Sequence, residues 1–306
     1  MNETPTSLRS SPPKGRSAWP TIAAAQARDA SARLPFHIAD AGQSWLAGSV
    51  ARAHLRALAR WPLALQLADG VLTLSLPAAE RNDFFRLANR RLHQDGLVVG
   101  WRDETYPVLA QHDGRLLATG ERAASRFWGT TTFGAHCNGY LANASGRPSH
   151  LWIARRAYNK PTDPGLLDNL VAGGVPHGQT PTACVLREGW EEAGLSPAQM
   201  RGLQPGRRLR VARDVPEGFQ LEELSVFDLA LPPGLQPVNQ DGEVHSVALL
   251  PVAEVLARAA VGEMTVDAAL VTLDFALRHR LLPAVDQARL AAQTAALWLG
   301  DTRLDR

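Results

Sequence analysis

The most constraining feature of this 306-residue chain is an acidic motif at residues 187–195, which reads Arg-Glu-Gly-Trp-Glu-Glu-Ala-Gly-Leu. Its glutamates Glu188, Glu191 and Glu192 stand at positions i, i+3 and i+4, which share one face of an α-helix with Cβ atoms about 5–6 Å apart. Three like charges on one face repel each other unless a cation compensates them. Because a hard divalent cation prefers carboxylate oxygens, the motif predicts a helix that binds such an ion.

The residues around the motif predict where this helix begins and ends. Thr180 suits the N-cap, Pro181 the first helical position, and Gly194 the C-terminal stop. At about 100° per residue, several apolar side chains fall opposite the glutamates and are expected to pack inward. These side chains are Ala183, Leu186, Trp190 and Ala193.

The spacing resembles the Nudix box, G-x5-E-x7-R-E-U-x-E-E-x-G-U, in which U is a bulky aliphatic residue. Gly173 takes the first position, and the second half is matched by Arg187, Glu188, Glu191, Glu192, Gly194 and Leu195. Gln179 replaces the first glutamate of the box, and Gly189 replaces an aliphatic residue. Since glycine in a helix costs up to about 1 kcal/mol, Gly189 predicts a close packing contact. The alternative is a solvated helix on which the same charges have no special role.

Within the box, the resemblance assigns structural roles to three residues. Arg187 lies beside the glutamate face and is expected to brace the loop at 173–179 rather than to contact phosphate. Gly173 and Gly174 are expected at a tight turn where a β-carbon would be obstructive. The Nudix family hydrolyses an organic group attached to a diphosphate. The resemblance therefore implies that Glu188, Glu191 and Glu192 are catalytic carboxylates and ligands of Mg²⁺, with Mn²⁺ as the alternative ion.

Three residues outside the helix are candidates for the rest of the site. Glu243 precedes a predicted strand and is the candidate for an additional ligand or general base; the alternative is an ordinary turn carboxylate. Lys160 is the one lysine beyond residue 14 and is a candidate for binding the terminal phosphate as a point charge, against simple exposure to solvent. His177 lies in a Pro-His-Gly turn and is a second substrate-binding candidate, with a surface histidine as the alternative.

The expected fold class is α/β: a Nudix α/β/α sandwich with a mixed sheet, preceded by a smaller α+β domain. We expect a disordered leader at 1–32, an N-terminal accessory domain at 33–129 and a Nudix domain at 130–300. Helices are predicted at 41–61, 78–94, 252–260, 266–281 and 284–299. Strands are predicted at 70–76, within 96–109, and at 130–141, 151–155, 169–172, 224–231 and 244–250.

Composition excludes several other classes of protein. A net charge of +2 without a dense basic run gives no electrostatic footprint for nucleic acid. No apolar run reaches the ~18 residues that a membrane-spanning helix needs. Two cysteines, Cys137 and Cys184, indicate no disulfide framework, so a reducing cytoplasm is the expected location. A small-molecule diphosphate is the expected partner, and a homodimer is left open.

Segments outside the box support a narrower resemblance over residues 35–285. They include Gly-Trp-Arg-Asp-Glu at 100–104 and Phe-Gly-Ala-His-Cys-Asn-Gly-Tyr-Leu at 133–141. They are similar to plant plastid Nudix hydrolases that carry an extra N-terminal domain, and to the N-terminal half of fungal thiamine pyrophosphokinase. This resemblance implies Mg²⁺-dependent hydrolysis of thiamine diphosphate, or of an oxidised analogue, to the monophosphate.

Four other functions are kept as alternatives. The first is hydrolysis of ADP-ribose or NADH, and the second is an isopentenyl-diphosphate-isomerase-like reaction, for which Cys137 is the candidate catalytic cysteine. A non-catalytic Nudix binding module is the third, and RNA decapping, disfavoured by the missing basic stripe, is the fourth. Two interpretations are open for three residues of the N-terminal part, Trp101, Arg102 and Glu104. They form part of a substrate lid or dimer contact, or they are a core tryptophan with a structural ion pair beside it.

Overall fold

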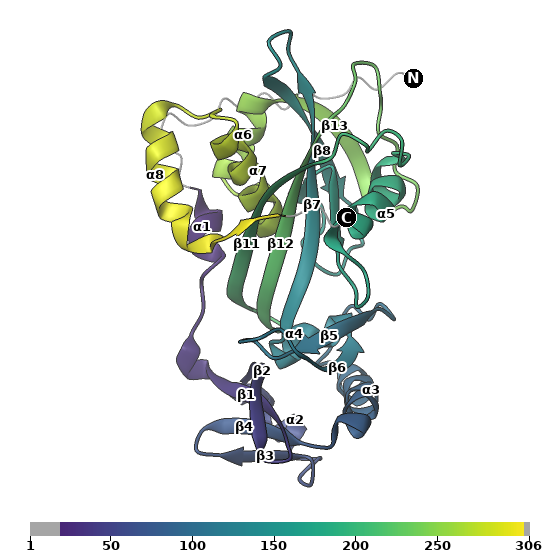
Figure 1. The fold of residues 1–306 in the computed structure, drawn as a ribbon, viewed down its shortest axis with the longest axis vertical. Coiled ribbons are helices and arrows are strands. Elements are labelled where there is room, and N and C mark those ends of the chain that lie inside the picture. Colours follow the sequence, from purple (N-terminus) through teal and green to yellow (C-terminus); the bar gives the residue numbers. More distant parts are fainter. Residues whose placement is uncertain (1–18, 303–306) are drawn as a thin grey trace, which may run out of the picture.

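The computed structural model describes residues 19–302 (Figure 1). The first part of the predicted leader, residues 1–18, lies outside the described residues. The expectation of disorder up to residue 32 is wrong for the remainder. Helix α1 (Pro20–Ala24) and the 3-10 turn η1 (Ala30–Ala32) are formed there.

Helix α1 packs on the C-terminal half of the chain although it begins the described sequence. Trp19 is 2% exposed and its backbone N–H donates to Ala260 O at 3.2 Å. The Thr21 hydroxyl donates to Val266 O at 2.9 Å. Just beyond the helix, Ala25 O accepts from the backbone N–H of Ala212 at 2.8 Å. Apolar burial and these backbone contacts therefore order a segment whose composition alone indicates disorder.

The N-terminal part is built on a four-stranded sheet in the order β2-β1-β4-β3, in which β1 and β4 are parallel. Its strands are β1 (Arg33–Asp40), β2 (Gln43–Ala51), β3 (Leu65–Ala68) and β4 (Val71–Ser75). The predicted helix at 78–94 is confirmed as α3 (Ala78–Gln94). Phe36, Phe85 and Trp128 join the sheet and α3 in one apolar core.

The helix predicted at 41–61 is wrong. Residues 43–51 form β2, which pairs antiparallel with β1, and the helical content is limited to η2 (Arg52–His54) and α2 (Leu55–Leu58). The alanine and leucine content of this stretch favours a helix, but pairing with β1 places Ala47 and Val50 in the core. Tertiary contacts therefore override the local preference.

A hairpin connects this part to the rest of the chain. It consists of β5 (Thr105–Leu109) and β6 (Leu116–Glu121), followed by η3 (Arg122–Ala124) and α4 (Ser125–Trp128). Figure 1 shows the hairpin and α4 between the lower sheet and the long strands of the upper part. Strands were predicted within 96–109 on both sides of the turn at 101–104. The strand after the turn is confirmed as β5, the strand before it is not formed, and β6 was not predicted.

The C-terminal part is a mixed sheet of eight strands whose main path is β13-β8-β7-β12-β11-β14, with β10 beside β7 and β9 beside β8. Strands β7 and β12 are parallel and the other pairs in this sheet are antiparallel. The strands are β7 (Thr131–Ala142), β8 (Pro148–Arg156), β9 (Leu167–Asp168), β10 (Val171–Gly174), β11 (Gln204–Val215), β12 (Gly218–Ala230), β13 (Val244–Pro251) and β14 (Trp298–Asp301).

Helices cover both faces of this sheet. The helices are α5 (Pro181–Ala193), α6 (Val252–Ala260), α7 (Val266–Arg278) and α8 (Ala284–Thr294). Phe227 of β12 packs in the core that contains α5, whereas its neighbour Val226 packs with α7. Since successive strand residues point to opposite faces, α5 and α7 lie on opposite sides of the sheet, and the α/β/α sandwich is confirmed. Within residues 19–302, no helix is long and apolar enough to cross a membrane.

The helix predicted at 284–299 ends earlier than expected. It stops at Thr294, and η4 (Ala295–Leu297) leads into β14, which pairs with β11 at the sheet edge. Strand β11 was not predicted either. Its arginine-rich sequence hides the alternation that buries Leu209 and Val211 against α7.

Candidate active site

Helix α5 begins and ends where the sequence predicts. The Thr180 side chain accepts a hydrogen bond from the Ala183 backbone N–H at 3.2 Å, and Pro181 is the first helical residue. Gly194 has φ 65°, and its N–H donates to the C-terminal carbonyls of the helix. The predicted close contact at Gly189 is confirmed, because a β-carbon there would lie 2.4 Å from the sulfur of Met200.

The predicted inward face of α5 is partly wrong. Trp190 is 53% exposed and Ala183 is also exposed, whereas Cys184, Val185 and Ala193 are buried against the sheet. The helix is therefore rotated so that part of its glutamate face turns toward β10. This rotation encloses two of the glutamates instead of leaving all three in solvent.

Strand β10 supplies the surface against which these glutamates lie. Glu192 is 8% exposed and accepts a hydrogen bond from the Ala172 backbone N–H at 2.8 Å. A β-carbon on Gly173 would lie 2.3 Å from the Glu188 carboxyl carbon. Gly173 and Gly174 are therefore in an extended strand and not in a tight turn, but a β-carbon is obstructive at both positions as predicted.

Arg187 makes its ion pairs within the helix. Its Nη2 lies 2.8 Å from Glu188 Oε1, and its Nη1 lies 2.6 Å from Glu191 Oε2. These contacts place the guanidinium between two of the glutamates rather than on the loop at 173–179. Arg187 therefore partly offsets the repulsion on this face of the helix.

Burial makes the two inner glutamates unfavourable places for negative charge. It raises the pKa of Glu188 against the opposing effect of Arg187. Burial also raises the pKa of Glu192 well above its ordinary value, and the neighbouring charge of Glu188 raises it further. Two enclosed carboxylates that oppose each other's charge form a site that a cation would stabilise.

The donors suit the magnesium ion that the Nudix box implies. Among the residues the structure describes, no three His, Cys, Asp or Glu side chains converge closely enough to hold an ion as they stand. Glu192 and Glu188, whose charge Arg187 only partly offsets, nevertheless provide the hard oxygen donors that Mg²⁺ prefers. We therefore assign Glu188 and Glu192 as the residues that would hold the ion, with Glu191 as the more exposed third donor.

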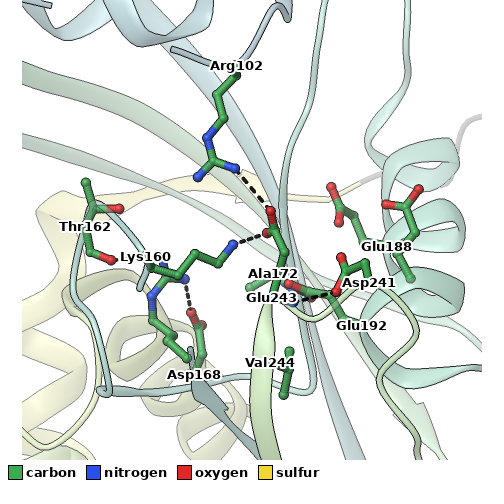
Figure 2. Close-up of polar contacts among 12 residues, drawn as sticks. Arg102, Lys160, Thr162, Asp168, Ala172, Glu188, Glu192, Asp241, Glu243 and Val244 are labelled. Carbon is green, nitrogen blue, oxygen red and sulfur yellow. Dashed lines mark hydrogen bonds and ion pairs between the residues drawn. The ribbon is translucent and has the colours of Figure 1, made fainter. Parts of the chain in front are cut away.

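Glu243 and Lys160 are brought together opposite the glutamates (Figure 2). The Lys160 ammonium forms an ion pair with Glu243 Oε2, and Arg102 Nη1 lies 3.1 Å from Oε1 of the same carboxylate. Burial, together with the charges of Arg156 and Arg102, lowers the pKa of Lys160 to about 8. Glu243 is thus held between two cations, and its predicted role as ligand or general base stays a prediction.

His177 lies elsewhere. Its side chain is exposed, and its backbone N–H donates to Thr105 O at 2.8 Å. It lines a separate cavity of about 830 Å³ with Arg208, Glu223 and Asp301. The structure does not group His177 with Lys160 or the glutamates, so its role in binding substrate stays a prediction.

Sequence reasoning missed two residues of the N-terminal part that reach the box. A β-carbon on Gly174 would lie 2.0 Å from the Tyr106 hydroxyl and 2.9 Å from the Arg122 guanidinium. Arg122 pairs with Glu104, at 3.0 Å from Nη1 to Oε2. Arg102, which the sequence analysis left open between two roles, donates a hydrogen bond to Glu243, 141 residues later in the chain. In the sequence, the pair Gly173-Gly174 was the one indication of this contact. A glycine at 174 leaves room for a neighbouring side chain, but the sequence does not show which one.

The fold and site together define a Nudix domain. Residues 135–269 match the NUDIX domain family, and residues 20–132 match a domain of unknown function, DUF4743. The predicted resemblance to the Nudix family with an extra N-terminal domain is thereby confirmed.

Particular relatives agree with this assignment. Nudix hydrolase 20, chloroplastic, of Arabidopsis thaliana is 37% identical over 219 residues, which cover 69% of this chain and 57% of that protein. Nudix hydrolase 24, chloroplastic, of the same plant is 36% identical over 62% of this chain and 52% of that protein. An uncharacterised protein of Saccharomyces cerevisiae is 33% identical over 60% of this chain and 56% of its own length. The chain thus spans about half the length of these curated relatives.

Among solved structures, a protein of Deinococcus radiodurans has a TM-score of 0.43 at 21% identity, covering 56% of this chain and 99% of its own. The NUDIX domain of Shewanella oneidensis NrtR, solved with ADP ribose, has a TM-score of 0.38 at 15% identity, covering 50% and 90%.

Proposed function

We propose that this chain is a divalent-cation-dependent diphosphohydrolase that cleaves an organic diphosphate. One observation carries the proposal: the enclosed carboxylates Glu188 and Glu192 lie opposite the cations Lys160 and Arg102 in one site (Figure 2). Carboxylates suit the metal, and cations suit the phosphate oxygens on which charge develops during cleavage. The Nudix domain match supports the same class of reaction.

Each side chain of the site has a separate role in this reaction. When bound, Mg²⁺ would neutralise diphosphate charge and lower the pKa of a coordinated water. Lys160 attracts a phosphate oxygen, while Glu243, held by Lys160 and Arg102, is the candidate acceptor for the proton of the attacking water. Arg187 keeps Glu188 and Glu191 in place through its two ion pairs.

Thiamine diphosphate or an oxidised analogue is the substrate that we propose, with the monophosphate as product. This choice is supported by the resemblance of residues 35–285 to the thiamine-linked subgroup. A nucleoside-diphosphate compound such as ADP-ribose or NADH is the alternative. Two buried, unpaired cysteines support a reducing, cytoplasmic location as part of the same proposal.

The isomerase alternative requires a reactive cysteine, and Cys137 is poorly placed for that role. It is fully buried in the apolar core shared by β7 and α5, and burial raises its pKa well above the ordinary value. A catalytic thiolate needs access and a lowered pKa. Hydrolysis is therefore the better supported reaction.

Product chromatography with Mg²⁺ tests the proposal. We expect the wild-type protein to convert thiamine diphosphate or oxothiamine diphosphate to the monophosphate faster than it cleaves ADP-ribose, NADH or 8-oxo-dGTP. Preferred cleavage of a nucleotide would retain the diphosphohydrolase proposal and reject the thiamine substrate. Absence of turnover with every compound would reject hydrolysis in favour of a binding module.

The lowered pKa of Lys160 predicts the pH dependence of this activity. Since a lysine is charged only below its pKa, kcat/KM is expected to fall as pH rises through about 8. Arginine stays charged over this range, so Lys160→Arg should remove that decline while lowering the maximal rate. A pH–rate profile of both proteins measures the effect, and an unchanged decline in the variant would assign it to another group.

A further inference from the structure

We propose that the DUF4743 domain forms part of the substrate site and that its Arg122 binds a phosphate of the substrate. The proposal rests on the diphosphate substrate proposed above, and it gives this domain of unknown function a role in substrate binding. A cavity of about 100 Å³ lies between the two domains. Its lining includes Arg102, Tyr106, Arg122 and Arg126 from the N-terminal side and Thr162 and Glu222 from the Nudix side.

The size and charge of this cavity suit a phosphate group. It is well below the ~300–1,000 Å³ of sites that enclose a whole drug-sized ligand. It brings together three arginines and two carboxylates: Glu217, which lies 3.6 Å from Arg126, and Glu222. Arginine is the side chain whose planar fork matches phosphate oxygens. The cavity is therefore fitted to one end of a substrate whose organic group lies outside it.

Arg122 is the cavity arginine whose guanidinium lies against Gly174 of the Nudix box. Its guanidinium lies 2.9 Å from where a β-carbon on Gly174 would be, and Gly174 follows the residue that touches Glu188. Arg122 therefore lies along the strand that positions the metal-binding glutamates.

Some N–H donors of the Arg122 guanidinium make no hydrogen bond to the described residues. Both hydrogen bonds to Glu104 come from Nη1, at 3.0 and 3.3 Å. Within residues 19–302, no hydrogen bond engages Nη2 or Nε, although a guanidinium carries five N–H donors. Glu104 thus fixes the side chain from one side and leaves the other for a ligand.

Tyr106 gives an independent indication that a polar ligand belongs here. The residue is 2% exposed, and among the described residues its hydroxyl has no hydrogen-bond partner. Buried hydroxyls in proteins are nearly always hydrogen-bonded. The hydroxyl lies against Gly174, and the Arg122 guanidinium is 5.6 Å from the centre of the Tyr106 ring. A phosphate oxygen beside Arg122 would provide the missing acceptor.

The test measures binding of methylenediphosphonate, a diphosphate that cannot be hydrolysed, by calorimetry with Mg²⁺. The full-length wild type is compared with Arg122→Gln, Arg122→Lys and the control Arg86→Gln. Arg86 is an arginine of the same domain on α3, half-exposed and paired with Asp83 at 3.0 Å. We expect Kd to increase at least tenfold in Arg122→Gln and less in Arg122→Lys, which retains the charge without the fork. Arg86→Gln should stay within twofold of wild type.

Kinetics separate phosphate binding from a structural role. Loss of a contact made equally in the ground and transition states raises KM with kcat nearly unchanged, so Arg122→Gln should show that split. An unchanged Kd in Arg122→Gln, or no binding of the diphosphonate by wild type, overturns the proposal. If wild type hydrolyses no compound yet Arg122→Gln weakens diphosphonate binding, the Arg122 assignment stands and the hydrolase proposal falls.

Discussion

Replacement of Glu192 by glutamine is expected to lower kcat for diphosphate hydrolysis by about 10²–10³-fold, the usual effect of removing one preorganised electrostatic group. Glu192 is the most enclosed of the three box glutamates and accepts the Ala172 N–H at 2.8 Å. Glutamine keeps the shape and the acceptor oxygen but removes the charge that would hold the ion. Steady-state kinetics over a range of Mg²⁺ concentrations measure the loss.

The same substitution should leave stability intact or raise it. Burial raises the pKa of Glu192 in the folded state, so the folded protein holds this proton more tightly than the unfolded chain does. The free energy of unfolding is therefore highest below the unfolded pKa and falls as pH rises through the folded pKa. At pH 8 without Mg²⁺, Glu192→Gln is therefore expected to melt at or above the wild-type temperature. Glu254→Gln, which changes a half-exposed glutamate on α6, is the matched control and should retain activity. Unchanged kcat in Glu192→Gln would remove this residue from the catalytic site.

Gly173→Ala is expected to reduce both activity and stability. The new β-carbon would lie 2.3 Å from the carboxyl carbon of Glu188, whose side chain is 13% exposed and has little room to retreat. Overpacking of this kind costs about 1–3 kcal/mol of unfolding free energy. Displacement of a metal-binding carboxylate should lower kcat by about 10²-fold. Denaturant unfolding and steady-state kinetics measure the two effects.

A double substitution shows whether the clash is the cause. Gly173→Ala combined with Glu188→Ala should recover part of the lost stability because the obstructed side chain is gone, while activity stays low. Gly202→Ala is the matched control, since the nearest atom to a β-carbon there is 3.8 Å away. If Gly173→Ala is as stable and active as wild type, the contact with Glu188 does not constrain this position.

Local signals predicted the elements in which one pattern extends over many residues. Helix α3 and helix α6 have the predicted bounds because apolar spacing and helix-favouring composition agree there. Strand β2 was mistaken for a helix because its alanines favour one, and only pairing with β1 decides the outcome. Strand β14 follows α8 closely, and the composition does not change between them. The sequence therefore does not indicate that β14 pairs with β11.

The candidate site shows the same division. The spacing within one helix predicted that Glu188, Glu191 and Glu192 lie together. The orientation of that helix was not predictable, since its inward face depends on how β10 meets it. Arg102 and Arg122 belong to another domain, and their approach to the box depends on contacts between residues far apart in sequence. No spacing rule within the motif includes them.

The docking of α1 limits how the two domains can move. The DUF4743 match begins at residue 20 and ends at residue 132, and the chain contacts the Nudix half at both of these ends. A domain joined by one linker can swing about it, but one anchored at two separated points is restrained in both bending and twisting. Arg122 would thus meet its substrate from a domain whose hinge motion relative to the Nudix half is restricted.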